Sequence, residues 1–215
     1  MSDTSLKNIE VELRGPLDEA AYQHLIAYSE SHGTLVSREN RFFIDYSTFI
    51  EGVGERKLDV RVRKTNGEVQ IVVKKGEFGG PNRTEAIVRV KDSDLVGAVQ
   101  MMGLLGYRKG VACDRGITRY DVDGIEIAIQ DVRRYRGDHG THSRFFEAEI
   151  LCHEGEADAA EARIRSLCQT IGLTVYEKSA WYDYVHRIND EANGVFDLDQ
   201  DDLNEIAGLG EPVMP

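Results

Sequence analysis

Several common chemistries are missing from this sequence. Its three cysteines, Cys113, Cys152 and Cys168, are scattered and form no CxxC pair, so neither a disulfide framework nor a zinc site is predicted. The sequence contains no P-loop, no Rossmann glycine fingerprint and no Ser/His/Asp arrangement. The most familiar nucleotide-binding loops and nucleophilic triads are therefore not indicated.

Long hydrophobic runs are missing as well. No apolar stretch approaches the roughly 18 residues of a membrane span, and no basic stretch followed by an apolar one marks a signal peptide at the N-terminus. We therefore expect a cytoplasmic protein without a membrane partner.

The excess of acidic residues is unevenly distributed. The formal net charge is −12, but residues 190–215 alone hold eight Asp and Glu residues and no Lys or Arg. We therefore expect one domain over residues 1–189, followed by an acidic, flexible tail over 190–215. Because local charge decides what a cleft attracts, the net charge does not exclude a small anionic ligand. No nucleic-acid partner is predicted.

Alternating residues and turn signals predict eight β-strands. They span residues 9–14, 41–47, 57–65, 68–75, 83–90, 112–121, 124–132 and 144–151. Asn66-Gly67 and Asp123-Gly124 favour tight hairpins, and therefore antiparallel pairing. Helical spacing of apolar residues predicts helices at 17–31, 93–105 and 156–171, with a further helix near 178–188.

Many of these strands carry charge on one face and apolar side chains on the other. In the first strand, Glu10, Glu12 and Arg14 alternate with apolar residues, and successive side chains of a strand point to opposite faces. For one strand alone, a face wetted by solvent is a sufficient interpretation. For the set, the pattern favours an α+β fold in which an eight-stranded antiparallel β-barrel, flanked by helices, encloses a charged tunnel.

Six short motifs in this sequence resemble those of the CYTH family, also called triphosphate tunnel metalloenzymes, and occur in the same order. They are Glu10-x-Glu12-x-Arg14, Arg61-x-Arg63, Lys74-Lys75 before a glycine, Leu105-Gly106-Tyr107 followed by Arg115, Glu147-x-Glu149, and Lys178-Ser179. The resemblance covers residues 9–185. It implies an eight-stranded antiparallel tunnel that is open at both ends.

The resemblance also implies a set of ligand-binding residues. The metal ligands for Mg²⁺ or Mn²⁺ would be Glu10, Glu12, Glu147 and Glu149, with Glu85, Glu126 and Gln130 as further candidates. The residues that clamp a triphosphate would be Arg14, Arg61, Arg63, Lys74 or Lys75, Arg115, Arg119 and Lys178. The implied substrates are tripolyphosphate, ATP or another nucleoside triphosphate, and thiamine triphosphate. These residue types suit the task, since carboxylates bind hard cations and Arg binds phosphate in a bidentate manner.

Several residues depart from the family pattern: Arg14 replaces the usual Lys, Ile87 and Arg89 follow Glu85 where further carboxylates are usual, and two more bear directly on turnover. Ile117 stands where a second basic residue is usual, and Gln130 stands where an acidic metal ligand is common. Three functions therefore remain open: a metal-dependent triphosphate hydrolase, a class IV-type adenylyl cyclase that makes cyclic AMP from ATP, and a tunnel that binds triphosphate without turnover. An exposed barrel end or helix face could also support a homodimer.

Overall fold

A single nine-stranded antiparallel sheet organises the chain. The computed structural model describes residues 8–51, 57–76, 84–138 and 140–212. The strands are β1 (Asn8–Leu17), β2 (Thr34–Asp45), β3 (Leu58–Thr65), β4 (Glu68–Lys75), β5 (Thr84–Arg89), β6 (Lys109–Val122), β7 (Ile125–Arg133), β8 (Thr141–His153) and β9 (Gly194–Asp197). Their order is β1-β8-β7-β6-β2-β3-β4-β5, and β9 pairs with β6.

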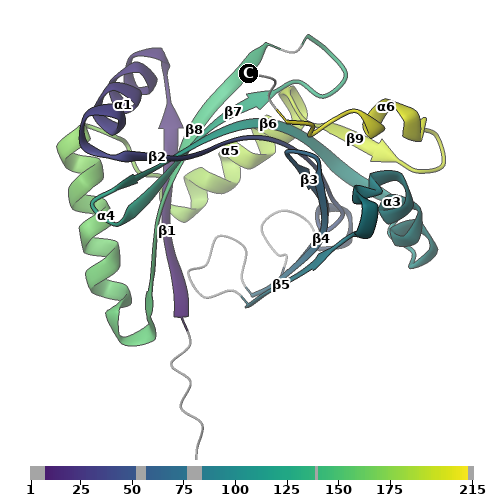
Figure 1. Cartoon of the computed structure of the whole chain (residues 1–215), viewed down its shortest axis with the longest axis horizontal. Coiled ribbons are helices and arrows are strands. Elements are labelled where there is room, and N and C mark those ends of the chain that lie inside the picture. The colour runs from purple at the N-terminus through teal and green to yellow at the C-terminus, as the bar shows by residue number, and fades with distance from the viewer. Residues whose placement is uncertain (1–7, 52–56, 77–83, 139, 213–215) are drawn as a thin grey trace, which may run out of the picture.

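The sheet arches strongly but does not close (Figure 1). In the part of the chain that the structure describes, β1 and β5 remain its two edges. The predicted α+β class is confirmed, whereas the predicted closed eight-stranded barrel is wrong. Side-chain alternation reports the two faces of each strand, but closure depends on whether two distant edge strands meet. Residue 83, the expected start of the fifth strand, lies outside the described residues.

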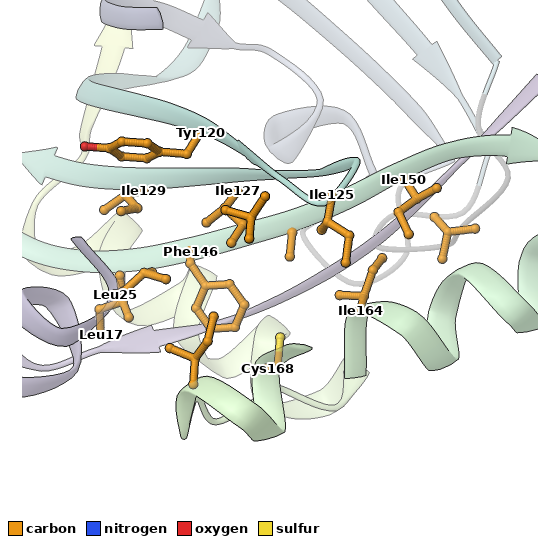
Figure 2. Packing of buried hydrophobic residues seen from close by; sticks show 14 of the residues in the cluster. Leu17, Leu25, Tyr120, Ile125, Ile127, Ile129, Phe146, Ile150, Ile164 and Cys168 are labelled. Carbon is orange, nitrogen blue, oxygen red and sulfur yellow. The ribbon is translucent and has the colours of Figure 1, made fainter. Parts of the chain in front are cut away.

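Two helices cover the convex face of the sheet at β1, β8, β7 and β6. They are α1 (Glu19–His32) and α4 (Ala157–Ile171). Leu25 from α1 and Ile164 from α4 are completely buried against Ile127 and Phe146 (Figure 2). Helix α4 ends at Gly172, whose φ of 79° is the left-handed cap conformation that glycine adopts without strain.

A second core lies on the convex face near β2, β3 and β4. Helices α3 (Leu95–Leu104) and α6 (Leu203–Ala207) contribute to it. The other short helical elements are α2 (Thr48–Glu51), η1 (Lys91–Ser93) and η2 (Glu154–Glu156), the last of which precedes α4. Leu95, Val99 and Met102 of α3 pack into this core with Phe196 of β9 and Ile206 of α6.

The segment expected to be a flexible acidic tail therefore contributes to this core. Phe196 and Ile206 are both 0% exposed, and β9 pairs with Lys109–Ala112 of β6. The ammonium group of Lys64 donates to the carbonyl oxygen of Ala207 at 2.9 Å. Residues 190–212 thus pack on the domain, because two apolar anchors outweigh the acidic composition around them.

Helix α5 (Lys178–Glu191) lies under the arch, on the concave side (Figure 1). Trp181, Tyr184 and Ile188 pack against Phe145 of β8 and Val132 of β7. This helix therefore forms one wall of the space that the sheet curves around. Within the described residues, no helix combines the length and the apolar character needed to cross a membrane.

Candidate functional site

The arched sheet and α5 enclose a cavity of about 340 Å³. Each of the strands from β1 to β8 contributes side chains to its lining. The register explains this convergence: Arg14 lies opposite Glu147, which lies opposite Ala128, which lies opposite Arg119. Residues opposite one another across a ladder share a face of the sheet, so one set of alternating positions faces the cavity throughout.

The wall formed by β1, β7 and β8 is rich in carboxylates. Its acidic residues are Glu10, Glu12, Glu126, Glu147 and Glu149. Three of them form a row across three strands, because Glu12 is opposite Glu149 and Glu149 is opposite Glu126. Directly opposed like charges destabilise a sheet unless a proton or a cation neutralises them.

Two carboxylates of this wall, Glu12 and Glu149, have a raised pKa and so retain their protons more strongly than an ordinary glutamate. Burial raises the pKa of Glu12 to about 8; Arg14 opposes this rise and Glu147 adds to it. Burial, together with Glu10 and Glu126, raises the pKa of Glu149 to about 7. Glu147 behaves differently. Burial acts to raise its pKa, but the opposing effects of Arg14 and of a hydrogen bond from Glu12 are together larger, so the pKa of Glu147 is lowered. Glu12 therefore holds the proton that it shares with Glu147.

The donor set of this wall fits a hard divalent cation. Mg²⁺ and Mn²⁺ prefer carboxylate oxygens, and the row of three glutamates offers them from adjacent strands. No three acidic, His or Cys side chains among the described residues already converge as a metal cluster. Glu12 instead accepts from Arg14, and Glu126 accepts from Arg119. A cation would have to draw these two carboxylates away from their guanidinium partners.

The opposite wall is rich in basic side chains. On β2, β3, β4 and β6 these residues are Arg41, Arg61, Arg63, Lys74, Arg115 and Arg119. Burial, with nearby Arg63 and Arg119, lowers the pKa of Arg41 to about 10, although Glu39 opposes the shift. Burial and neighbouring Arg61 likewise lower the pKa of Arg63. The part of this wall around Arg41 and Arg63 therefore has too little negative charge of its own.

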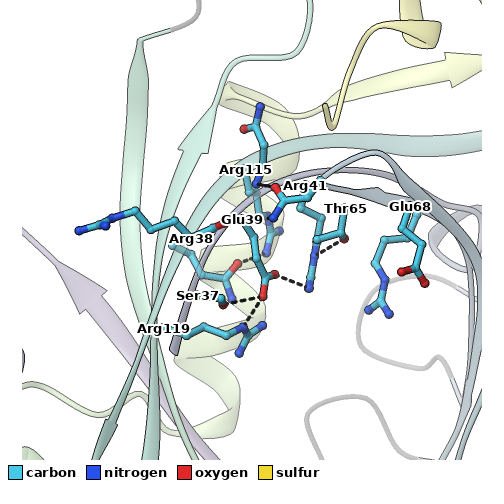
Figure 3. Close-up of polar contacts among 12 residues, drawn as sticks. Ser37, Arg38, Glu39, Arg41, Thr65, Glu68, Arg115 and Arg119 are labelled. Carbon is cyan, nitrogen blue, oxygen red and sulfur yellow. Dashed lines mark hydrogen bonds and ion pairs between the residues drawn. The ribbon is translucent and has the colours of Figure 1, made fainter. Parts of the chain in front are cut away.

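The arginines divide into two groups by their partners. Arg61 is held by Asp45 at 3.3 Å and by Asp59 at 3.2 Å. Glu39 lies between Arg41 at 2.8 Å and Arg119 at 2.9 Å (Figure 3). These arginines are therefore already positioned by carboxylates.

Arg63 and Arg115 instead bond to neutral amides. Arg63 donates to Gln70 at 3.1 Å, and Arg115 donates to Gln130 at 3.0 Å. The guanidinium of Arg115 also lies over the rings of Phe43 and Phe145. These two arginines are the best placed to accept an external anion, because their hydrogen-bond partners within the described part of the chain are amides and not carboxylates.

Most of the residues predicted from the sequence meet in this cavity. Those that line it are Glu10, Glu12, Arg14, Arg61, Arg63, Lys74, Glu85, Arg115, Arg119, Glu126, Gln130, Glu147 and Glu149. Lys75 does not, because Lys74 faces the cavity and the next residue of a strand points away. Lys178 is exposed at the start of α5, near the ring of Tyr182.

Gln130 connects the two walls. Its Oε1 accepts from Arg115, and its Nε2 donates to Glu147. The side chain is 3% exposed, so both ends of its amide are used inside the protein. In this structure Gln130 is a bridge between an arginine and a carboxylate.

Sequence reasoning missed the contribution of β2. Arg41, Phe43 and Asp45 line the cavity, and Glu39 supports Arg41 from the same strand. The signal was available, since Arg41-Phe-Phe-Ile-Asp45 alternates like the other strands. The strand also begins at Thr34, seven positions before the predicted start at 41.

Comparisons with known proteins identify relatives of this chain by fold and not by sequence. No family model and no curated protein matches it. Solved structures do match: the PH1819 protein of Pyrococcus horikoshii shares 19% identity over 83% of this chain and 98% of its own, with a TM-score of 0.61. A protein of Vibrio parahaemolyticus described as a candidate adenylate cyclase shares 16% identity over 83% of this chain and 98% of its own, with a TM-score of 0.57.

A third similar structure, HpAC1 from Hippeastrum, is described as an adenylyl cyclase candidate with a dominant triphosphatase activity. It shares 14% identity over 83% of this chain and 96% of its own, with a TM-score of 0.53. At these identities the likeness shows a shared fold. The chain thus shares the fold of structures described as adenylyl cyclase candidates, in agreement with the family that its six motifs resemble.

Proposed function

We propose that the cavity binds a divalent metal–triphosphate complex and hydrolyses the triphosphate. The observation that carries the proposal is the opposite electrostatic imbalance of the two walls. The pKa values of Glu12 and Glu149 are raised to about 8 and about 7, whereas that of Arg41 is lowered to about 10. A cation beside the carboxylates and a polyanion beside the arginines would relieve both imbalances at once.

Each wall would have a separate task. Glu10, Glu12, Glu126 and Glu149 would hold Mg²⁺ or Mn²⁺, which supplies charge neutralisation at the phosphate oxygens when bound. Arg63 and Arg115 would bind the phosphates directly, because their present partners are neutral amides. The remaining arginines would complete the electrostatic clamp from positions set by Asp45, Asp59 and Glu39.

The reaction needs little from the protein beyond positioning and charge. Water adds to a terminal phosphorus, the bond from that phosphorus to the bridging oxygen breaks, and its electron pair leaves with the diphosphate. Fixed guanidinium groups stabilise the negative charge that develops on the leaving and non-bridging oxygens. The proton of the attacking water leaves with the phosphate products or the solvent.

Cyclisation of ATP is the second candidate, because the similar Vibrio protein is described as an adenylate cyclase candidate. Hydrolysis is preferred, since a dominant triphosphatase activity is attributed to HpAC1 on the same fold. The two reactions differ in their products, which are phosphate in one case and cyclic AMP with diphosphate in the other.

The test combines product analysis with binding. Wild-type protein is incubated with tripolyphosphate, ATP or GTP and Mg²⁺ or Mn²⁺, while phosphate, diphosphate and cyclic AMP are measured. Fluorescence of Trp181, the single tryptophan, reports tripolyphosphate binding because this residue lines the cavity. We expect metal-dependent phosphate release, and an affinity about 10- to 100-fold lower in Arg63→Ala.

Arg165→Ala is the matched control, because Arg165 is a solvent-exposed residue of α4. If cyclic AMP and diphosphate are the main products, the protein is a cyclase and the proposed hydrolysis is wrong. If triphosphate binds tightly and no product forms, the cavity is a binding site without catalytic activity. Absence of binding by the wild-type protein would overturn the proposed site.

A further inference from the structure

Helix α3 is apolar on both of its sides. Between Leu95 and Leu105 the only polar side chain is that of Gln100, and no residue is charged. A surface helix of a globular protein normally carries charged and polar residues on the face that points away from the core. An apolar face in that position indicates a contact with another surface.

Three large apolar side chains lie on the outward side of α3. Leu104 is 89% exposed and Met101 is 44% exposed, while Leu105, the C-cap, is 66% exposed. Residues three and four positions apart are neighbours on a helix surface, so these three form one continuous surface, the α3 patch. It lies on the outer side of the arch (Figure 1), and none of its residues lines the cavity. The α3 patch is therefore separate from the proposed triphosphate site.

The charges around the α3 patch are placed symmetrically. Asp94 stands seven residues before Met101, and Arg108 stands seven residues after it. Both side chains are exposed. The carboxylate of Asp94 is held at the start of the helix, because it accepts from the backbone N–H of Gly97 at 2.7 Å. The guanidinium of Arg108 lies beside the end of the helix, with Nη1 3.8 Å from the position that a Cβ on Gly103 would take.

We propose that the α3 patch is the interface of a homodimer in which two α3 helices pack antiparallel about a two-fold axis near Met101. Such an axis brings Asp94 of each copy next to Arg108 of the other, and it buries Leu104 and Leu105 of both copies. The antiparallel arrangement also places each helix end beside the oppositely charged end of its partner. Because so short a helix covers less than a standard interface, we expect a weak dimer with a micromolar Kd.

The surroundings of α3 favour a second copy over a lipid surface. Helices that lie on membranes carry Lys and Arg on their polar face, which attract anionic lipids, whereas α3 has neither. Helix α6 packs beside α3 and brings two acidic residues, Asp202 at its N-cap and Glu205 in its first turn. This neighbourhood would be repelled by an anionic membrane, while a second copy matches its charges.

Analytical ultracentrifugation of the full chain tests the apolar part of the interface. Between about 5 and 500 µM, a range that spans a micromolar Kd, the mass of the wild type should rise from that of one chain towards that of two. Leu104→Lys changes a side chain that is 89% exposed, so the fold should persist. We expect this variant to weaken the dimer at least about tenfold. Leu151→Lys, on a β8 residue that is 69% exposed, is the matched control and should leave the dimer unchanged.

A double-mutant cycle tests the orientation of the two helices. Asp94→Asn removes the charge but keeps an N-cap residue, and Arg108→Gln removes its partner. Each change should weaken the dimer about two- to fivefold. The double variant should be no weaker than the single ones, because each of them removes the same contact. Additive losses would overturn the antiparallel pairing.

The remaining outcomes decide whether the surface is a dimer interface. A wild type that stays monomeric at the highest concentration would overturn the proposal, and so would equal effects of Leu104→Lys and Leu151→Lys. Vesicles of phosphatidylserine and phosphatidylcholine are sedimented with the wild type and with Leu104→Lys. Binding by a monomeric wild type that is lost in Leu104→Lys would assign the α3 patch to a lipid surface instead.

Discussion

Glu12 on β1 lies directly opposite Glu149 on β8, and both side chains line the same cavity. Burial raises the pKa of Glu12 to about 8 and the pKa of Glu149 to about 7, so neither carboxyl group has its ordinary pKa. Two directly opposed carboxylates repel each other unless a proton or a cation neutralises them. Their arrangement becomes favourable when a cation lies between them.

Glu149→Gln should stabilise the metal-free protein while weakening its response to metal. Removing one of two opposed acids should raise the free energy of unfolding by about 0.5 kcal/mol, which corresponds to a Tm increase of about 1–2 °C. The additional stabilisation that Mg²⁺ or Mn²⁺ gives the wild type should shrink. Thermal unfolding with chelator and with metal measures both effects. Glu161→Gln, an exposed change on α4, should alter neither, and an unchanged metal response in Glu149→Gln would argue against the metal site.

The pH dependence of stability should carry the signature of Glu149. Burial and its acidic neighbours raise its pKa from 4.5 to about 7. A group that holds its proton more tightly in the folded chain contributes stability that is fully present below its unfolded pKa and is lost as the pH rises through its folded pKa. In chelator, the stability of the wild type relative to Glu149→Gln should therefore fall between pH 4.5 and 7. Urea unfolding across this range measures it, and a constant difference would contradict the raised pKa.

Substitution of Arg61 by alanine should lower the free energy of unfolding more than the same substitution of Arg63. Arg61→Ala leaves Asp59, which is 0% exposed, and Asp45 without the guanidinium between them. We expect a destabilisation of about 3 kcal/mol. Among the described residues, Arg63→Ala removes two hydrogen bonds to the neutral amide of Gln70 and should cost less than about 1.5 kcal/mol. Chemical denaturation of both variants measures the two losses of stability. A larger loss in Arg63→Ala than in Arg61→Ala would contradict the prediction.

Gln130→Glu should uncouple the two walls. The change replaces the donor to Glu147 with an acceptor in a position that is 3% exposed. We expect a loss of about 1–3 kcal/mol in metal-free protein at neutral pH, part of which Mn²⁺ restores by neutralising the added charge. Unfolding with chelator and with Mn²⁺ measures this recovery. Gln169→Glu adds the same charge on exposed α4 and should show no metal-dependent recovery; equal behaviour of the two variants would refute the bridging role.

Phe196→Ala should destabilise the whole domain, because the side chain is 0% exposed in the core that β9 and α6 complete. The expected loss is about 3–5 kcal/mol. Val195→Ala, on the neighbouring residue that is 57% exposed, should cost far less. Thermal and urea unfolding compare the two. Equal, small losses would mean that residues 190–212 are a dispensable tail after all.

Local pattern was sufficient to predict most of the cavity. Glu10, Glu12 and Arg14 share a face because a strand repeats every two residues, and the same rule placed Glu147 and Glu149 on their strand. The rule could not choose between Lys74 and Lys75, since both faces of β4 carry apolar residues. The same rule would have placed Arg41 and Asp45 of β2 on the cavity face, but it was not applied to that strand.

What the sequence by itself determined is which side chains share a face of each strand, and hence that a charged surface lies in one antiparallel α+β fold. Only the tertiary structure decided which charges meet, since the row from Glu12 to Glu149 to Glu126 depends on the pairing of β1, β8 and β7. It also decided that the sheet stays open and that Phe196 is buried. The reason is physical: alternation is a property of consecutive residues, whereas register, closure and burial depend on segments far apart in the chain.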